Sequence, residues 1–215
     1  CSAPSQVAIR FCIKGLSCTI ASGFNSGFNA IQYGINMLKR GHAKHVLVGS
    51  VEELCEQTYK AFHQLQLLSG SKEGDDELSA PLDRRRNGFV MGEGAVVFML
   101  ETLETARARK AKVCAEISGI REENSFTNVS RLKPYLKDID DFIDSQRSNN
   151  FIVDDVDFVS IGVNSSKVRD LLEARIINRI FTSGSEAAVS GIKSLTGESF
   201  SAAVGFQILA ALFCM

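Results

Sequence analysis

The stretch that most constrains the fold reads Asp83-Arg84-Arg85-Arg86-Asn87-Gly88-Phe89-Val90-Met91-Gly92-Glu93-Gly94-Ala95. It places a cluster of mixed charge directly before a run of spaced glycines. Glycine accepts backbone conformations that other residues avoid, and a charge is tolerated inside a protein only beside a partner. The stretch therefore predicts a buried ion pair next to a tight turn, which leads into a buried strand from Gly94 to Leu100.

A second glycine turn lies upstream of this stretch. Residues Arg10 to Ser22 are rich in Ile, Cys and Thr, which predicts a strand buried on both faces. Gly23 supplies the turn, and apolar residues at near-helical spacing after it predict a helix that ends at Gly41. Val46 to Gly49 then reads as a short buried strand. A strand, a helix and a strand at this spacing predict a parallel pair of strands.

The rest of the chain continues to alternate between helix-like and strand-like segments, as α/β proteins do. The predicted helices cover Cys55 to Leu68, Leu103 to Lys110, Leu132 to Ile143, Val168 to Ile180 and Ser199 to Phe213. The further predicted strands cover Val113 to Gly119 and Val156 to Val163. Residues 121–150 are polar and of mixed charge, so we expect a surface connector between two halves there.

The composition excludes several classes of partner. The chain has 24 Lys and Arg residues against 25 Asp and Glu residues, whereas binding of nucleic acid needs clustered positive charge. No segment resembles a signal peptide, and the most apolar stretch, Ala202 to Met215, is too short to cross a bilayer and contains Gln207. We therefore expect a soluble protein with neither a nucleic-acid partner nor a membrane partner.

The cysteines are scattered along the chain and include no C-x-x-C pair. This spacing indicates neither a zinc site nor a disulfide framework, so we expect no metal and no other cofactor. We expect thiols that pack as small apolar side chains in a reducing cytoplasm. Cys12 and Cys18 precede the turn at Gly23, where packing would raise the pKa of a thiol and make it a poor nucleophile. The six are Cys1, Cys12, Cys18, Cys55, Cys114 and Cys214.

Two further motifs accompany the glycine-rich stretch. Residues Ser17 to Gly27 read Ser-Cys-Thr-Ile-Ala-Ser-Gly-Phe-Asn-Ser-Gly, and residues Lys193 to Gly197 read Lys-Ser-Leu-Thr-Gly. Together with Asp83 to Ala95 they resemble the β-ketoacyl synthase family, whose members elongate acyl chains held on a carrier protein. The resemblance implies an α/β fold of the thiolase-like type, with α/β/α/β/α layers, of which this chain covers only the central part.

The resemblance also implies a division of the chain. Residues 1–120 would be the end of the N-terminal thiolase-like half, with the turn at Gly23 and the glycine-rich motif. Residues 121–150 would be a variable connector, and residues 151–215 the start of the C-terminal half. The family's opening and closing segments have no counterpart here. We therefore expect either a fragment or a protein whose remainder lies outside these residues.

The family's catalytic residues are a Cys at a helix N-terminus and two His, and this chain carries other residues at all three positions. The Cys position holds Phe24, whose ring cannot accept an acyl group. The first His position holds Asn164, which cannot exchange a proton near neutral pH. The second holds Glu198, whereas Lys193 of the Lys-Ser-x-Thr-Gly motif is retained. The resemblance therefore implies that this chain has no catalytic residue.

Each of these positions also has a purely structural interpretation. Phe24 is either an ordinary core residue or a side chain that plugs or lines an acyl tunnel. Asn164 is either a turn residue after a strand or a binding residue. For Glu198 we expect a structural contact with Lys193. The histidines lie elsewhere, at His42, His45 and His63.

By this resemblance, the chain would be a non-catalytic ketosynthase-like subunit, a chain-length factor, in type II polyketide, polyene or fatty-acid-type chain elongation. It would form a heterodimer with an active ketosynthase, meet an acyl carrier protein, and bound the tunnel that limits product length. Chain-length factors usually carry Gln at the nucleophile position, so Phe24 departs from that pattern. Two alternatives stay open. One is an atypical active condensing enzyme that uses Glu198 or a displaced cysteine, and the other is a non-enzymatic homodimer that binds acyl chains or carrier protein.

Overall fold

The computed structural model describes residues 3–122, 137, 140–141, 143–144, 156–181 and 186–215. The chain divides into two compact units, each assembled from separate stretches of sequence. The first unit contains Cys1–Glu53, Glu93–Ile120 and Ser199–Leu212, and the second contains Leu54–Gly92, Arg121–Glu198 and Phe213–Met215. The Phe24 position therefore falls in the first unit, whereas the Asn164 and Glu198 positions fall in the second.

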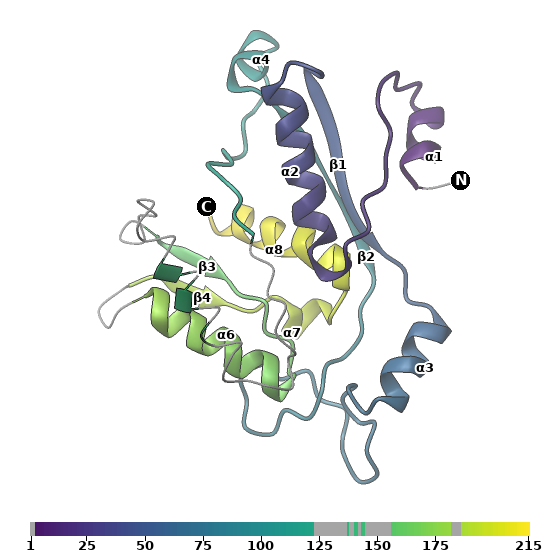
Figure 1. The fold of residues 1–215 in the computed structure, drawn as a ribbon, viewed down its shortest axis with the longest axis vertical. Helices are drawn as coiled ribbons and strands as arrows, with labels where there is room; N and C mark the ends of the chain where they lie inside the picture. The colour runs from purple at the N-terminus through teal and green to yellow at the C-terminus, as the bar shows by residue number, and fades with distance from the viewer. Residues whose placement is uncertain (1–2, 123–136, 138–139, 142, 145–155, 182–185) are drawn as a thin grey trace. The chain divides into compact units, whose positions relative to one another are not determined.

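A two-stranded antiparallel sheet forms the centre of the first unit (Figure 1). It consists of β1, His45–Glu52, and β2, Gly94–Glu101, paired along their whole length. Successive side chains of a strand point to opposite faces of the sheet. Val48 and Val96 are accordingly buried on one face, whereas Val97 on the other face is exposed.

Helices α2 (Ser26–Lys39) and α8 (Phe200–Cys214) cover the buried face of this sheet. Their core consists of Ile31, Val48 and Val204, each less than a tenth exposed. Glycines in α2 permit the close packing, since a Cβ on Gly34 would lie 2.7 Å from Val48 Cγ2. The helical elements of the first unit are α1 (Ala3–Arg10), the 3-10 turn η1 (Gly23–Asn25), α2 (Ser26–Lys39), α4 (Leu103–Ala108) and α8 (Phe200–Cys214).

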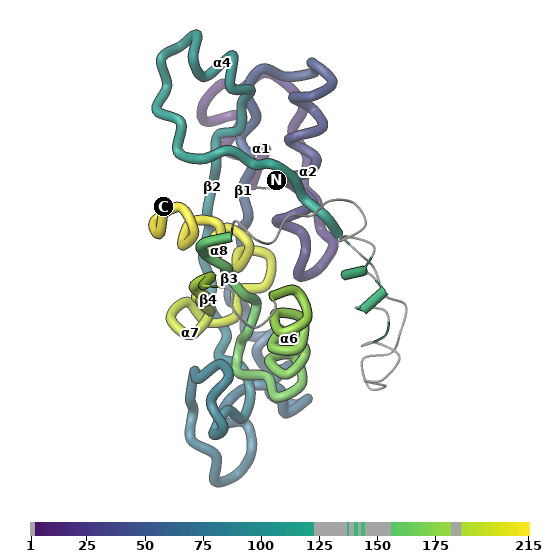
Figure 2. Tube along the Cα trace, turned by 90° about the vertical axis from the view of Figure 1, so that its left-hand side faces the viewer, coloured from purple at the N-terminus to yellow at the C-terminus, as the bar shows by residue number. Residues whose placement is uncertain are grey.

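The second unit is built on a short parallel pair of strands. β3, Phe158–Ser160, pairs with β4, Ala188–Ser190, and α6, Lys167–Ile180, runs beside them (Figure 2). The unit also contains α3, Glu56–Gln64, and the single-turn helix α7, Lys193–Thr196. Leu172 on α6 and Ile161 and Val163 after β3 are buried, so the apolar interior lies between the helix and the strands.

The prediction of a buried strand from Arg10 to Ser22 is wrong. Helix α1 extends to Arg10, and residues 11–22 form neither helix nor strand and are almost entirely exposed. A strand needs neighbours to pair with, and no described strand lies beside this segment. The prediction of a parallel pair is also wrong, because β1 pairs with β2 in antiparallel orientation. Cys12 and Cys18 are likewise exposed instead of packed.

Most other predicted elements are confirmed, with shifted ends. Helices occur at α2, α3, α4, α6 and α8, and Gly41 follows α2 with a φ of +70°. The strand expected from Val113 to Gly119 is absent from the described chain, and the one expected from Val156 to Val163 shrinks to β3. The helix expected from Leu132 to Ile143 and the connector at 121–150 lie mostly outside the described residues. The division at 1–120, 121–150 and 151–215 stays a prediction.

Candidate functional site

In the first unit, the sharp turn before α2 presents Phe24. Gly23 opens this turn with a φ of +76°, a conformation that costs glycine nothing. Ser26 Oγ fixes the turn by donating to the Gly23 carbonyl at 2.6 Å and accepting from the Ser22 N–H at 2.9 Å. Phe24 is thereby held at the N-terminus of a fourteen-residue helix. In this place a thiol would be activated by the positive end of the helix dipole.

The ring of Phe24 packs against another aromatic ring. The centroids of Phe24 and Phe200 lie 5.3 Å apart at an angle of 56°, a tilted arrangement that aromatic pairs favour. Phe200 begins α8 with a φ of 44°, an unusual conformation for a residue with a side chain. Phe24 nevertheless stays 37% exposed. Phe24 is therefore neither a fully buried core residue nor a free surface side chain.

In the second unit, Glu198 is the centre of a buried polar network. Its side chain is fully buried, and its Oε2 accepts a hydrogen bond from Lys193 Nζ at 2.8 Å. This confirms the contact expected between Glu198 and Lys193. Asn164 Nδ2 donates to the same oxygen at 2.7 Å, so two positions that the sequence resemblance assigns to catalytic histidines contact each other here.

Asn164 is at once a turn residue and a member of this network. Its Oδ1 accepts from the N–H of Ser166 at 3.1 Å, which is the side-chain-to-backbone bond of an Asx turn. Ser165 between them has a φ of 75° and is fully buried. Because the turn fixes Oδ1, the amide Nδ2 is directed to Glu198.

The glycine-rich stretch binds the backbone of Glu198. The Glu198 N–H donates to the Val90 carbonyl at 2.7 Å, and the Gly92 N–H donates to the Glu198 carbonyl at 3.0 Å. A Cβ on Gly92 would lie 2.0 Å from the carbonyl oxygen of Thr196. Position 92 therefore requires glycine, because the backbone of Thr196 leaves no room for a side chain. This close packing of the two backbone segments also fixes the position of Glu198.

Asp170, which the sequence interpretation missed, anchors the Asn164 turn. It is fully buried in the first turn of α6, and its two oxygens accept the N–H groups of Asn164 at 2.9 Å and Leu82 at 2.8 Å. Arg86 Nε lies 3.4 Å from the same carboxylate. The sequence signal that could have identified Asp170 is an acidic residue in the first turn of the helix that follows Asn164.

The stretch from Asp83 to Ala95 predicts a buried ion pair, and the structure contains one. Its acidic residue, however, comes from another element. Arg86 pairs with Asp170, whereas Asp83 forms a surface pair with Arg85. Hydrogen bonds from the Arg85 side chain and backbone N–H lower the pKa of Asp83 to about 2. The stretch from Asp83 to Ala95 thus supplies Arg86, the cation of the buried pair. It also supplies both members of the separate surface pair.

These groups offer little chemistry of their own. A phenyl ring and an amide neither form an acyl intermediate nor exchange protons near neutral pH, and Glu198 is engaged by two N–H donors. Among the described residues, no cluster of His, Cys, Asp and Glu is arranged to hold a metal ion. Within the same residues, none of the helices has the length and apolar character needed to span a bilayer.

Comparison with known proteins accounts for nearly the whole chain. The beta-ketoacyl synthase N-terminal domain matches residues 1–106, and the beta-ketoacyl synthase C-terminal domain matches residues 114–215. A Streptomyces halstedii protein named as a polyketide beta-ketoacyl synthase 1 is 30% identical over 220 residues, which cover 98% of this chain and 51% of that protein. This chain thus spans about half the length of the relatives that it matches.

Two solved structures share the fold. One shows a type II polyketide synthase acyl carrier protein in complex with its ketosynthase, with a TM-score of 0.83, 24% identity, and coverage of 98% of this chain and 53% of that one. The other is the ishigamide ketosynthase/chain length factor, with a TM-score of 0.74, 22% identity, and coverage of 92% and 47%.

The expected α/β fold of the thiolase-like type is therefore confirmed. Since the two domains of one family match residues 1–106 and 114–215, the chain belongs to the beta-ketoacyl synthase family.

Proposed function

We propose that this chain is a non-catalytic, cytoplasmic ketosynthase-like subunit of the chain-length-factor type. It pairs with an active β-ketoacyl synthase as a heterodimer, and the partner supplies the Cys and the two His. The observation that carries the proposal is Phe24, an aromatic ring at the helix N-terminus where this family keeps its nucleophile. No thioester with the growing chain can form on a hydrocarbon ring.

The buried network in the second unit supports the same conclusion. Glu198 and Asn164 bond to each other, and Glu198 also bonds to Lys193. A carboxylate that already accepts two short hydrogen bonds is held in place as part of the fold. We infer that these residues preserve the shape of the former site after its chemistry was lost.

Type II polyketide chemistry is the context that the relatives favour. The Streptomyces halstedii relative is named for polyketide synthesis, and the structural neighbours include a ketosynthase with its acyl carrier protein and a ketosynthase/chain length factor. We propose that this subunit likewise meets an acyl carrier protein, and that it bounds the tunnel for the growing chain. Related polyene or fatty-acid-type elongation is included in this proposal.

Acyl transfer from a carrier protein tests the absence of a nucleophile. The purified protein is incubated with malonyl- and hexanoyl-loaded acyl carrier protein and analysed by intact-mass spectrometry. We expect no acyl adduct on the natural chain. The matched variant, Phe24→Cys, places a thiol at the N-terminus of α2, where the dipole lowers a thiol pKa. We expect peptide mapping to find residue 24 of this variant alkylated by iodoacetamide faster than the exposed Cys12 and Cys18.

An acyl thioester on the natural chain would refute the proposal, and peptide mapping would identify the cysteine or carboxylate responsible. Product formation by the natural chain alone, with no second synthase present, would also refute it. The heterodimer is tested separately by co-expression with a type II ketosynthase that retains its Cys and both His. Co-purification in a one-to-one ratio is the expected result.

A further inference from the structure

One end of the first unit carries a concentration of positive charge. Residues 39–44 and 107–112 contain seven of the chain's 24 Lys and Arg residues and no Asp or Glu, so the rest of the chain holds 17 cations against 25 acidic residues. The nearly balanced total charge thus conceals a strongly basic surface and an acidic remainder. We call this surface the basic end, and its exposed cations are Lys39, Arg40, Lys44, Arg107, Lys110 and Lys112.

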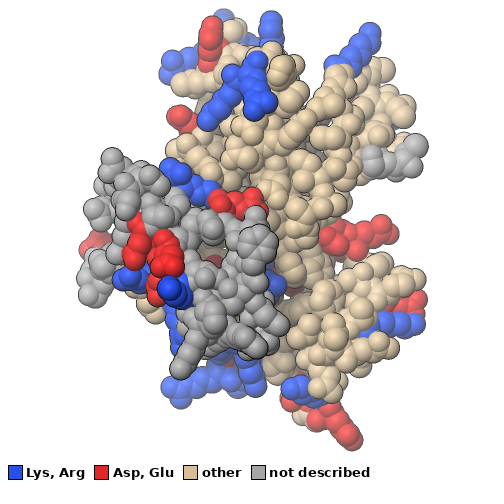
Figure 3. All heavy atoms as spheres, viewed as in Figure 1, with Lys and Arg blue, Asp and Glu red and all other residues tan. Residues whose placement is uncertain are grey.

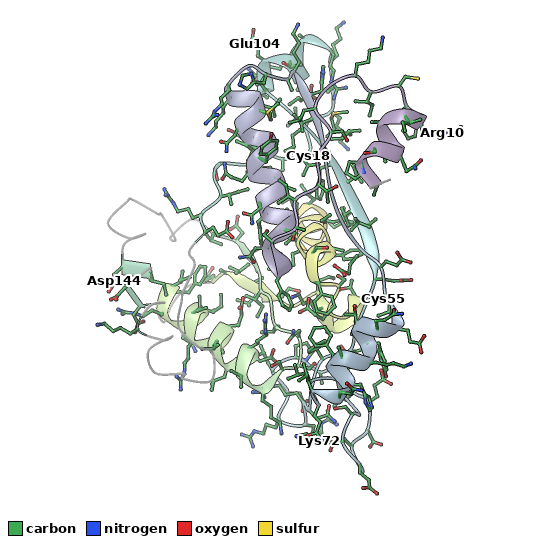
Figure 4. The ribbon with its side chains drawn as sticks, turned by 45° about the vertical axis from the view of Figure 1, so that its right-hand side comes forward. Arg10, Cys18, Cys55, Lys72, Glu104 and Asp144 are labelled. Carbon is green, nitrogen blue, oxygen red and sulfur yellow. The ribbon has the colours of Figure 1, made fainter. Side chains whose placement is uncertain are left out.

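The two basic segments lie close together because the sheet of the first unit aligns them. His45, the first residue of β1, pairs directly with Glu101, the last residue of β2. The chain that enters β1 and the chain that leaves β2 are therefore at the same end of the sheet. Helix α2 ends there at Lys39, and α4 begins there at Leu103. Figure 3 shows Lys and Arg gathered at this end, and Figure 4 places Glu104 of α4 there.

The neighbouring acidic residues offset little of this charge. Arg109, the seventh cation, donates to the Glu101 carboxylate, with Nε 2.9 Å from Oε2, and the Glu101 side chain is only 10% exposed. This charge-assisted pair neutralises Arg109 and removes its acid from the surface. Glu104 is the single acidic residue of α4. The basic end therefore keeps a clear excess of positive charge.

Stabilisation of helix ends accounts for only part of the cluster. Cations in the last turn of a helix interact favourably with its dipole, and Lys39 and Arg107 occupy such positions in α2 and α4. Lys44, Lys110 and Lys112, however, lie beyond the helix ends and outside any strand. Like charges gathered on one surface repel each other, so the cluster opposes folding of the isolated chain. A negatively charged partner would offset this repulsion.

We propose that the basic end docks an acidic protein surface. Complementary charge accelerates association and rejects partners of the wrong sign. Leu103 and Val113, which are 45% and 48% exposed, flank the cations of the second segment and supply the apolar contacts that protein interfaces contain. A long polyanion such as nucleic acid is a poorer match, because its repulsion from the acidic remainder of the chain grows with its length. A compact acidic surface contacts the cations alone.

The basic end is separate from the Phe24 turn. The two lie at opposite ends of α2, whose fourteen residues extend over about 21 Å at about 1.5 Å per residue. A protein docked at the C-terminal end of this helix therefore binds apart from the position where the family keeps its nucleophile. The inference concerns an additional protein contact and does not depend on whether the chain is catalytic.

Fluorescence anisotropy of a labelled poly-Glu peptide, used as the acidic polypeptide, tests the charge recognition on the full chain. We expect binding that weakens steeply between about 0.05 M and about 0.5 M NaCl, because salt screens exposed charges. The triple variant Lys44→Glu, Lys110→Glu and Lys112→Glu should bind at least about tenfold more weakly. The neutral variant Lys44→Gln, Lys110→Gln and Lys112→Gln should show a smaller loss, and it keeps the test valid where the acidic variant folds poorly.

The matched control makes the same change of net charge elsewhere. Lys14, Lys72 and Arg84 are exposed and also lie outside helices and strands. Their replacement by Lys14→Glu, Lys72→Glu and Arg84→Glu should leave the affinity for poly-Glu close to that of the natural chain. Circular dichroism of both acidic variants should match the natural chain, because none of the substituted residues belongs to a regular element.

Single-stranded RNA and phosphatidylglycerol vesicles are the competing anions, compared with poly-Glu at equal concentration of negative charge. Tighter binding of either one would overturn the inference. Absence of poly-Glu binding by the natural chain, or an equal loss in the two acidic variants, would overturn it as well. Acyl transfer and co-purification with a synthase are measured independently, so failure here is distinguishable from failure of the proposed function.

Discussion

Lys193 and Glu198 form an ion pair inside the second unit, with Nζ 2.8 Å from Oε2 and side chains that are 9% and 0% exposed. They lie five positions apart in sequence, and the single turn of α7 and the left-handed Gly197 bring them together. A pair so completely removed from water is held by mutual neutralisation and by the additional bond from Asn164. Removal of one partner leaves the other as an uncompensated charge.

We expect Lys193→Met to destabilise the protein by about 3–5 kcal/mol, the usual cost of leaving a buried carboxylate without its cation. Urea unfolding followed by circular dichroism measures this loss. The matched control is Lys60→Met, which breaks the exposed pair of Lys60 with Glu56 and should change stability by less than about 1 kcal/mol. Equal effects of the two variants would show that the Lys193 pair does not stabilise the fold.

Adding a methyl group at Gly92 should displace the segment that carries Glu198. A Cβ there would lie 2.0 Å from the Thr196 carbonyl oxygen, and such overpacking typically costs about 1–3 kcal/mol. Gly119→Ala is the control, since nothing lies within 4 Å of its Cβ. The difference in urea midpoint between the two variants gives the result, and a harmless Gly92→Ala would contradict the close approach.

The sequence predicts the site better than it predicts the sheet. Each motif contains its own local turn, so a few consecutive residues suffice to predict it. This holds for the Gly23 turn, the Asn164 turn and the contact between Lys193 and Glu198. Asp170 was missed because it enters from another element, and only the folded unit brings it to Arg86. The strand expected from Arg10 to Ser22 failed because strand formation depends on a neighbour, which a local pattern does not report.

The surface pair of Asp83 and Arg85 predicts a pH dependence at the acid end. Hydrogen bonds from Arg85 lower the pKa of Asp83 from 3.8 to about 2 in the folded protein. A carboxyl whose pKa is lower when folded contributes stability above its unfolded pKa, and this contribution disappears as pH falls from 3.8 towards 2. The stability difference between the natural protein and Asp83→Asn should therefore shrink across this range.

Carbon-detected NMR titration of the Asp83 carboxyl measures the same shift directly. Arg85→Gln removes the charged donor and should return the midpoint towards 3.8. Arg84→Gln, next in the chain, has no part in the causes of this shift and is the control. A midpoint near 3.8 in the natural protein would contradict the pairing.

The contact between Phe24 and Phe200 should be measurable as an aromatic coupling. A double-mutant cycle with Phe24→Leu and Phe200→Leu isolates the ring–ring interaction from simple loss of apolar area. Rings 5.3 Å apart and tilted by 56° should give a coupling of about 0.5–1.5 kcal/mol in urea unfolding. Phe28 is the matched control because it is also 37% exposed, and its Leu variant should show no coupling to Phe200→Leu. Absence of coupling at Phe24 would mean that the ring occupies the turn without support, and the aromatic pair would then not explain why this position tolerates a phenyl group.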